Sequence, residues 1–263
     1  MQTSPAKPCI ALMGEFSAGK TTLANLLIGE SPLPVRIIAT QLPPVKISFG
    51  TGDPYQVDLE GHQSPIALDA LDGLDLTRIL YLQLFSDADL LTHCDLLDMP
   101  GISDPNMNAV IWERMIDQAH GVIWCSNAVQ AWRQSEAAVW AEIPAHIHAQ
   151  SLLLLTQIDK INSPTDRARI LARVNRETQH MFRAVLPISL LMATEEQDNY
   201  DLWAQSGAGA LVDQLVGLLN DLNTGQIRAA PNVIPALQAP RQAAPDTPRI
   251  LPRRIKAIEH GES

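Results

Sequence analysis

The sequence predicts a three-layer α/β fold, in which a mostly parallel sheet is covered by helices on both faces. Short apolar runs alternate with longer segments of helical periodicity through the second half of the chain, which is the pattern of parallel β-α-β units. The run LLLL at 152–155 has no polar residue, as expected for a strand that is buried on both sides. Two alternating runs, 45–49 and 55–59, are joined by glycines and indicate an antiparallel edge.

The first elements follow from local composition. The apolar stretch 8–13 is expected to be a buried strand. The segment 20–28 is expected to be a helix, because its leucines share one face, and Gly29 ends it. Four prolines in 31–44 predict a loop.

The next elements are expected to be strands. The runs 45–49 and 55–59 are expected to pair as a hairpin, whereas 61–77 shows no clear pattern. The run 79–85 is dense in strand-forming residues, although a helix is an alternative. The run 94–98 is a further strand, which the following Met-Pro-Gly terminates.

The second half of the chain alternates regularly up to a change in composition. The expected elements are helices 107–119, 132–142, 165–183 and 208–222, and strands 121–127, 151–156 and 184–189. After about residue 228 the sequence becomes rich in Pro and Ala. We therefore expect a folded domain over 1–228 and an extended or disordered tail over 229–263. A basic cluster near the end of the tail is either solvated or docks on a protein partner or lipid headgroups.

Charge and hydropathy restrict the class of protein. The 263 residues carry a formal net charge of −10, and 46% of them are hydrophobic, which is enough to build a core. Non-specific binding of nucleic acid or anionic lipid depends on cationic surface, so neither is expected. The N-terminus lacks a signal peptide, and no apolar run approaches the ~18 residues of a membrane span. We expect a cytoplasmic protein with no transmembrane segment.

The cysteines and two tryptophans have structural interpretations. Cys9, Cys94 and Cys125 lie in or beside apolar runs and are expected to be buried free thiols, not disulfide or zinc ligands. Trp132 and Trp140 lie eight residues apart in a stretch expected to be helical. Core packing is the first interpretation, and an exposed surface for a dimer or a partner is the alternative.

Residues 14–21, GEFSAGKT, match the phosphate-binding loop pattern between a strand and a helix. In such a loop glycines let backbone N–H groups wrap a phosphate, and the following helix offers its positive end. Lys20 would reach the outer phosphates, and the Thr21 hydroxyl could bind a bridging Mg²⁺. The predicted fold is therefore that of the P-loop NTPases. The residues expected at the nucleotide are Gly14, Glu15, Ser17, Ala18, Gly19, Lys20, Thr21 and Thr22.

Asp98 and Gly101 stand at the end of the strand 94–98 in a D-x-x-G arrangement. The Asp98 carboxylate is expected to hold Mg²⁺ through water, and the Gly101 N–H to bind the last phosphate. Ligands in parallel sheets bind at the carboxyl ends of strands. This element therefore belongs beside the phosphate-binding loop.

The sequence Thr156-Gln157-Ile158-Asp159 ends a later strand, where GTPases read the base. The Asp159 carboxylate can accept both N–H groups on the edge of guanine, a pair that adenine lacks. Leaving that carboxylate unpaired would be costly, so it discriminates between the bases. Ser189 and Leu190 follow the next strand, where a short loop usually touches the base.

The stretch GEFSAGKTTLANLLIG resembles the opening of the bacterial dynamin-like GTPases, and LPVRIIATQLPPVKISFG resembles their first switch. The resemblance covers roughly 8–222. It implies that Thr40 closes on Mg²⁺ when the third phosphate is present. It also implies that Ser17 helps to bind a monovalent cation, which stands in for an arginine finger. Thr156 is consistent with the family. The catalytic residues implied are Lys20, Thr40 and Ser17.

The chain departs from the family pattern at three positions. Gln157 replaces the lysine whose alkyl stem packs on guanine, which predicts weaker binding with the glutamine lying along the ring. Phe16 and Ile102 stand where related GTPases use a glutamine to orient water. Because neither side chain can hydrogen-bond, slow basal hydrolysis is expected.

Together these features predict a GTP-binding and GTP-hydrolysing switch that uses GTP or GDP with Mg²⁺. It is expected to be a lone dynamin-type domain without a stalk. Self-association across the nucleotide face, or a protein partner bound through the tail, would stimulate it, and a partner could hold it at the membrane. One alternative is a scaffold that binds guanine nucleotide without hydrolysing it. Another is a P-loop protein that hydrolyses ATP.

Overall fold

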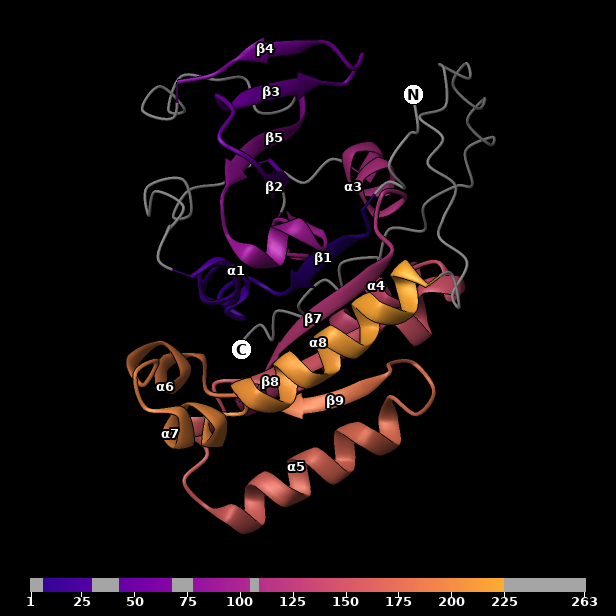
Figure 1. Ribbon diagram of the computed structural model, residues 1–263. Coiled ribbons are helices and arrows are strands. Elements are labelled where there is room, and N and C mark those ends of the chain that lie inside the picture. Colours follow the sequence, from indigo (N-terminus) through magenta and orange to yellow (C-terminus); the bar gives the residue numbers. More distant parts are fainter. Residues whose placement is uncertain (1–6, 30–42, 68–77, 105–108, 225–263) are drawn as a thin grey trace, which may run out of the picture. The chain divides into compact units, whose positions relative to one another are not determined.

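The computed structural model describes residues 7–29, 43–67, 78–104 and 109–224. Within those residues, nine strands form one sheet in the order β4-β3-β5-β2-β6-β1-β7-β8-β9 (Figure 1). The strands are β1 (Cys9–Gly14), β2 (Val45–Phe49), β3 (Tyr55–Asp58), β4 (Gln63–Pro65), β5 (Ile79–Ser86), β6 (Asp95–Asp98), β7 (Gly121–Asn127), β8 (Leu152–Thr156) and β9 (Ala184–Pro187). Thr40 and the tail 229–263 lie outside the described residues.

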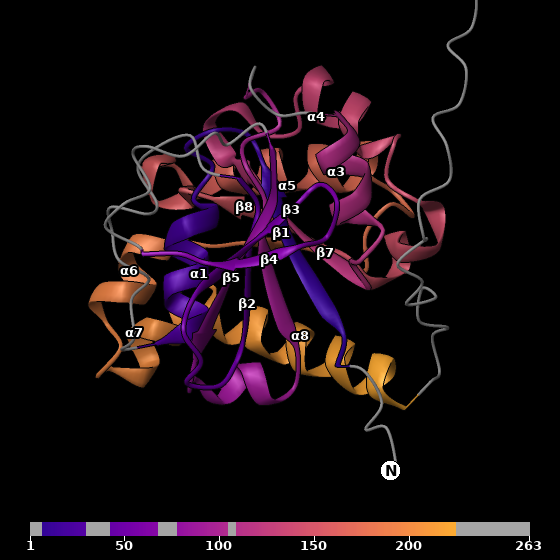
Figure 2. The same ribbon diagram turned by 90° about the horizontal axis from the view of Figure 1, so that it is seen from above.

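Helices cover both faces of this sheet, as the sequence predicts. The α-helices are α1 (Lys20–Ile28), α3 (Ala109–Ile116), α4 (Gln134–Trp140), α5 (Pro164–Glu177), α6 (Leu190–Glu195), α7 (Tyr200–Gln205) and α8 (Ala208–Asn223). Short 3-10 helices are η3 (Asp89–Thr92), η4 (Ala128–Gln130), η5 (Ala145–Gln150) and η6 (Ile158–Lys160). Figure 2 shows α8 on one side of the sheet and α3 and α4 on the other. None of the helices in the described ranges is long and apolar enough to cross a membrane.

The central strand β1 is buried on both faces and separates two cores. Its Ile10 and Leu12 side chains contribute to the core beneath α1, α6 and α8, while Ala11 and Met13 contribute to the core beneath α3, α4 and α5. Alternate side chains of a strand point to opposite faces, so an uninterrupted apolar run satisfies both cores. The parallel pairs β6-β1, β1-β7, β7-β8 and β8-β9 bring the carboxyl ends of five strands to one edge.

Aromatic side chains fill the core beneath α4. The ring centroids of Trp124 and Trp140 are 5.5 Å apart at 88°, and Trp132 and Phe182 lie 5.4 Å apart at 85°. Trp132 is 7% exposed and Trp140 is 2% exposed. The core interpretation of these tryptophans is therefore confirmed. Cys9, Cys94 and Cys125 are buried free thiols, as expected.

The prediction that the runs 45–49 and 55–59 pair as a hairpin is wrong. β5 lies between β2 and β3 and pairs in parallel with β2 and antiparallel with β3. β5 is almost entirely buried, so it needs a neighbour on each side. β2 also pairs antiparallel with β6. The strand direction therefore reverses inside the sheet, between β6 and β2, and not only at the edge of the sheet.

Some boundaries also differ from expectation. Helix α5 ends at Glu177, earlier than expected, because His180 takes a positive φ of 66° that a helix cannot contain. Helices α6 and α7 were not predicted, and each is only six residues long. Pieces this short carry too few turns to show a periodicity.

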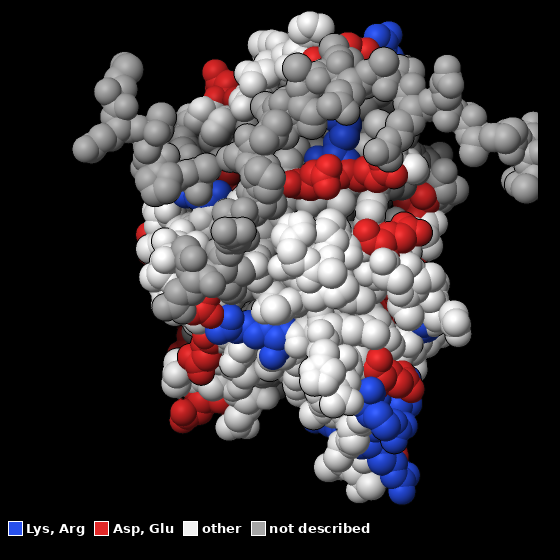
Figure 3. Space-filling view, turned by 90° about the vertical axis from the view of Figure 1, so that its right-hand side faces the viewer, with Lys and Arg blue, Asp and Glu red and all other residues white. Residues whose placement is uncertain are grey.

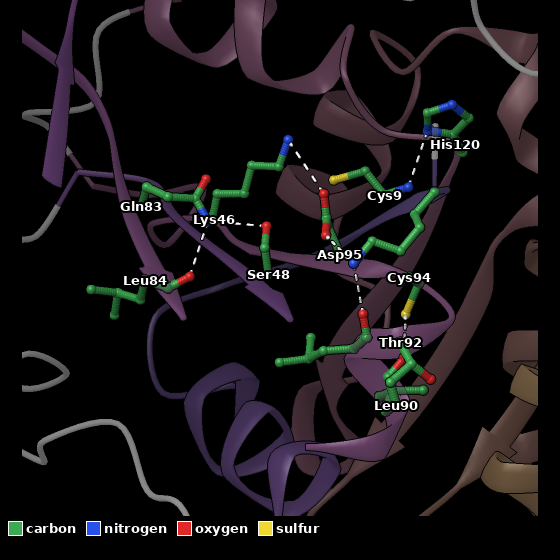
Figure 4. Close-up of polar contacts among 12 residues, drawn as sticks. Cys9, Lys46, Ser48, Gln83, Leu84, Leu90, Thr92, Cys94, Asp95 and His120 are labelled. Atoms are coloured by element: carbon green, nitrogen blue, oxygen red, sulfur yellow. Dashed lines mark hydrogen bonds and ion pairs between the residues drawn. The ribbon is translucent and has the colours of Figure 1, made fainter. Parts of the chain in front are cut away.

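A polar cluster holds the strands at the edge opposite the loop (Figure 4). The Asp95 carboxylate lies 3.6 Å from the Lys46 ammonium, and the Cys9 N–H donates to Nδ1 of His120 at 3.1 Å. Burial lowers the pKa of His120, which suits the neutral ring that this acceptor role requires. These contacts fix the amino ends of β1 and β6.

Basic side chains are concentrated on α5. Lys and Arg side chains gather at the lower end of the molecule in Figure 3, over this helix. The helix carries Arg167, Arg169, Arg173 and Arg176, and only Val174 is buried. Arg169 pairs with Asp166 at 3.3 Å on the exposed surface, which makes it a suitable control position away from the loop.

Candidate nucleotide-binding site

The predicted loop begins at Gly14, where β1 ends beside β7. Gly14 pairs with Cys125 and has a φ of 137°. A Cβ added at Gly14 would lie 2.1 Å from the carbonyl oxygen of Cys125. Only glycine can therefore end β1 at this point and let the chain turn into the loop.

Lys20 is the first residue of α1, and its ammonium turns back into the loop. Its Nζ donates to the carbonyls of Gly14 at 2.9 Å and Glu15 at 2.8 Å, and the residue is 8% exposed. Burial lowers the pKa of Lys20, while the Asp98 charge acts in the opposite direction. Gly19 caps α1 without a side chain, so the first amides of the helix remain available to an anion. An uncapped helix start beside a buried ammonium fits a phosphate group.

Asp98 ends β6 in register with Leu12 of β1. Burial raises the pKa of Asp98 to about 6, and the charge on Lys20 opposes this shift. Thr21 is half-buried in the first turn of α1. A hydroxyl and a carboxylate are the oxygen donors that Mg²⁺ prefers, so this pair of residues fits the predicted ion.

Gly101 lies against the loop. A Cβ at Gly101 would be 3.0 Å from the backbone nitrogen of Phe16, and the N–H of Ile102 donates to Gly14 at 3.2 Å. The D-x-x-G segment is thus in backbone contact with the phosphate-binding loop. The side chain of Phe16 is 80% exposed.

The segment expected to read the base, residues 156–159, is hydrogen-bonded directly to the loop. The Thr156 hydroxyl donates to the Ala18 carbonyl at 2.8 Å, and Nε2 of Gln157 donates to the Ser17 carbonyl at 3.0 Å. Ser17 and Gln157 both adopt the left-handed region, at φ 57° and 55°. Residues other than glycine adopt this region uncommonly, and such strained residues often lie at functional sites. Asp159 follows on η6 and is exposed.

The Gln157 side-chain amide also forms hydrogen bonds outside the loop. Its Oε1 accepts from Nδ2 of Asn127 at 3.1 Å and from Nζ of Lys160 at 2.6 Å. In this arrangement the glutamine ties the loop to β7 and η6. Lys160 places its cation one residue after Asp159. Asn127 is not among the site residues predicted from the sequence, although its position at the carboxyl end of β7 could have indicated that it lies at the site.

The loop after β9 completes this edge of the sheet. Ser189 is 3% exposed, and its hydroxyl caps α6 by accepting from the N–H of Met192 at 3.3 Å. Leu190 lies against Gly19, since a Cβ there would be 2.9 Å from Cδ1 of Leu190. The structure therefore brings four predicted segments to one edge, namely 14–21, 98–101, 156–159 and 189–190.

The Glu15 side chain contacts residues that sequence reasoning missed. Its Oε1 accepts from the Ser135 hydroxyl at 2.8 Å and lies 3.1 Å from Nη2 of Arg133. Its backbone carbonyl belongs to the loop, as predicted. No local pattern could indicate the side-chain contact, because the partners are more than 100 residues away in the sequence.

Comparison with known proteins agrees with this geometry. Dynamin-like protein 2 of Campylobacter jejuni is 25% identical over 216 residues, which are 80% of this chain and 34% of that protein. Two solved structures of an oligomerised bacterial dynamin pair, described as sensing and tethering membranes over a long range, cover 84% of this chain at 20% identity. Their TM-scores are 0.61 and 0.59. The chain is similar to bacterial dynamin-like proteins over about four fifths of its length.

The chain has a mixed, mostly parallel sheet with helices on both faces, as the sequence predicts. It spans about a third of the length of its relatives, since it covers 37% and 36% of the two solved chains. No family model matches it. The similarity to dynamin-like proteins rests on one relative in sequence and on a shared fold.

Proposed function

We propose that this chain binds GTP and GDP with Mg²⁺ and hydrolyses GTP slowly as a dynamin-like switch. The observation that carries the proposal is the direct hydrogen bonding between the phosphate-binding loop and the base-reading element, through Ala18–Thr156 and Ser17–Gln157. A triphosphate and a base are joined in one molecule. A site that holds both must keep the two elements at a fixed separation, and these bonds do so.

Each residue has a task in the proposed reaction. The Lys20 ammonium neutralises the outer phosphates, and Thr21 and Asp98 hold the metal ion, which neutralises the charge that develops on the phosphoryl group. The Asp159 carboxylate selects guanine by accepting its two N–H groups. Ser189 and Leu190 border the base. Thr40, outside the described residues, is proposed to complete the metal site, and Ser17 to bind a monovalent cation.

Slow hydrolysis follows from the side chains near the attacking water. Phe16 and Ile102 occupy the positions expected to orient water, and neither can hydrogen-bond. Positioning supplies much of the catalysis in phosphoryl transfer. Water must therefore be positioned by backbone, by Thr40 or by a second chain.

Exposed apolar side chains support a second chain at this edge. Phe16 is 80% exposed, Val129 after β7 is 55% exposed and Leu191 after β9 is 60% exposed. All three follow the carboxyl ends of strands in the parallel part of the sheet. Apolar side chains gathered at one edge indicate a contact surface. We propose that two copies associate across the nucleotide face and that this accelerates hydrolysis.

Phosphate release at several protein concentrations tests the proposal. A rate that rises with the square of concentration supports activation by self-association, and a linear rise indicates a self-sufficient enzyme. GTP should compete better than ATP for the site. The variant Lys20→Ala should lose nucleotide binding, whereas Arg169→Gln on α5 should retain it.

Two results would contradict the proposal in different ways. Tight GTP binding without phosphate release at any concentration would support the scaffold alternative. Stronger binding of ATP than of GTP would support the ATP-hydrolysing alternative and remove the role of Asp159.

A further inference from the structure

Glu15 and Arg133 form an ion pair beside the phosphate-binding loop that the proposed function does not use. The Glu15 side chain is 10% exposed and the Arg133 side chain is 47% exposed, with 3.1 Å between Oε1 and Nη2. The Ser135 hydroxyl donates to the same carboxylate at 2.8 Å. Burial would raise the pKa of Glu15, but hydrogen bonds from Ser103 and Ser135 and the Arg133 charge hold it below its usual value.

The main chain of Glu15 holds the loop from the opposite side. Its carbonyl accepts from Nζ of Lys20 at 2.8 Å and from the N–H of Ala18 at 3.2 Å. One residue therefore orients the lysine through its carbonyl and is fixed through its carboxylate. A displacement of the carboxylate would be transmitted to Lys20.

The partner segment of Glu15 is itself rigid. Trp132 has a positive φ of 56°, its N–H donates to the Ser126 hydroxyl at 2.9 Å, and its ring is packed in the aromatic core. The Arg133 N–H donates to Glu136 at 2.9 Å, and Glu136 is 2% exposed. A tryptophan with a positive φ is strained, and this backbone conformation persists only where the surrounding contacts determine it. This segment can therefore serve as a fixed support.

We propose that Glu15 is a positioning residue, which holds the phosphate-binding loop and the Lys20 ammonium in place through its ion pair with Arg133. The proposal rests on the proposed function, in which that loop binds the phosphates of GTP. The Ser103 contact extends the same support to the segment that follows Gly101. Nucleotide affinity then depends on Arg133, although this residue is not proposed to touch the nucleotide.

Whether removal of the Glu15 charge tightens or weakens nucleotide binding distinguishes a positioning role from simple charge repulsion. A carboxylate near a triphosphate repels it, so removal of the charge alone should tighten nucleotide binding. If Glu15 positions the loop, Glu15→Gln should instead weaken GDP binding about tenfold, because a charge-assisted contact is lost. Arg133→Gln should weaken it similarly, and Arg133→Lys should restore part of the loss.

The experiment combines two measurements on the full chain. Hydrogen exchange of the Ala18 amide, measured without nucleotide, should accelerate in Glu15→Gln and Arg133→Gln but not in the control Arg169→Gln. GDP affinity should fall in the first two variants, and the double variant should be no worse than either single one. Circular dichroism confirms that each variant is folded.

The outcomes are distinct. Tighter GDP binding by Glu15→Gln, additive losses in the double variant, or unchanged exchange at Ala18 would each overturn the positioning role. If the wild-type protein binds no guanine nucleotide but exchange at Ala18 is still faster in Glu15→Gln and Arg133→Gln, the positioning role stands and the proposed function is rejected instead.

Discussion

Replacing Gly14 with alanine should destabilise the sheet where β1 enters the loop. Two costs add at this position. A φ of 137° is unfavourable for a residue with a side chain, which costs about 1–3 kcal/mol. The new Cβ would also lie 2.1 Å from the Cys125 carbonyl oxygen. Ordinary contact begins near 3.4 Å, so β1 and β7 would have to move apart by about 1 Å in a close-packed core.

Gly61 provides a matched control for the first cost alone. It has a φ of 89° in an exposed turn, and a Cβ there would meet nothing within 4 Å. Gly61→Ala should therefore cost about 1–3 kcal/mol from backbone strain. Gly14→Ala should cost a further 1–3 kcal/mol or so from overpacking. The combined loss is a large fraction of the roughly 5–15 kcal/mol that stabilises a typical domain.

Urea unfolding followed by circular dichroism measures the difference. With a slope of about 1–3 kcal/mol per molar urea, the Gly14→Ala midpoint should fall below that of Gly61→Ala by roughly 1 M. GDP binding should also be lost in Gly14→Ala and kept in Gly61→Ala. Equal midpoints for the two variants would show that β1 and β7 do not approach as described, and the reasoning would fail.

Further predictions concern thiols, a buried acid, pH and base choice. Burial raises the pKa of the Cys9, Cys94 and Cys125 thiols to about 12. At pH 8 a thiol reagent should therefore label almost none of them in the native protein and all three of them in urea. Glu136→Ala leaves the Trp124 indole N–H unpaired and should lower the free energy of unfolding by about 1–3 kcal/mol, whereas Glu177→Ala on the surface should change it little. The pKa of Glu15 lies below its usual value of about 4.5, so its ionised form stabilises the fold above that pH. The stability advantage of wild type over Glu15→Gln should hold above about pH 4.5 and shrink as pH falls through the lower folded pKa. Asp159→Ala should abolish the preference for GTP over ATP in competition binding.

The parallel part of the sheet was predictable because its determinants are local. Strands β7, β8 and β9 are apolar runs, and each lies near a helix that covers it, so sequence order gives their neighbours. The pairing of β2 was not predictable. Glycines between β2 and β3 favoured a hairpin, but the burial of β5 on both faces placed it between them. Competition between distant segments decided that pairing.

In the candidate site too, the features set by local sequence were predictable and the contacts between distant segments were not. The phosphate-binding loop and the strand-end motifs are short patterns, and the structure brings their described residues to one edge. The contacts of Glu15 with Arg133 and of Gln157 with Asn127 and Ser17 join distant segments. Gln157 was expected to lie along the base, and its engagement by the loop follows from folding and not from the residue type. Such contacts depend on tertiary placement, which no local pattern specifies.

The hydrogen bond between Gln157 and Ser17 also constrains protein engineering. If Asp159 selects the base as proposed, redesign for an unnatural purine would disturb Gln157, which lies two residues earlier and is hydrogen-bonded to the proposed phosphate-binding loop. In the proposed function, base selectivity and nucleotide affinity are therefore coupled through this hydrogen bond. Because Ser17 accepts through its backbone carbonyl, an orthogonal variant will need its compensating change at Asn127, whose side chain also bonds to Gln157.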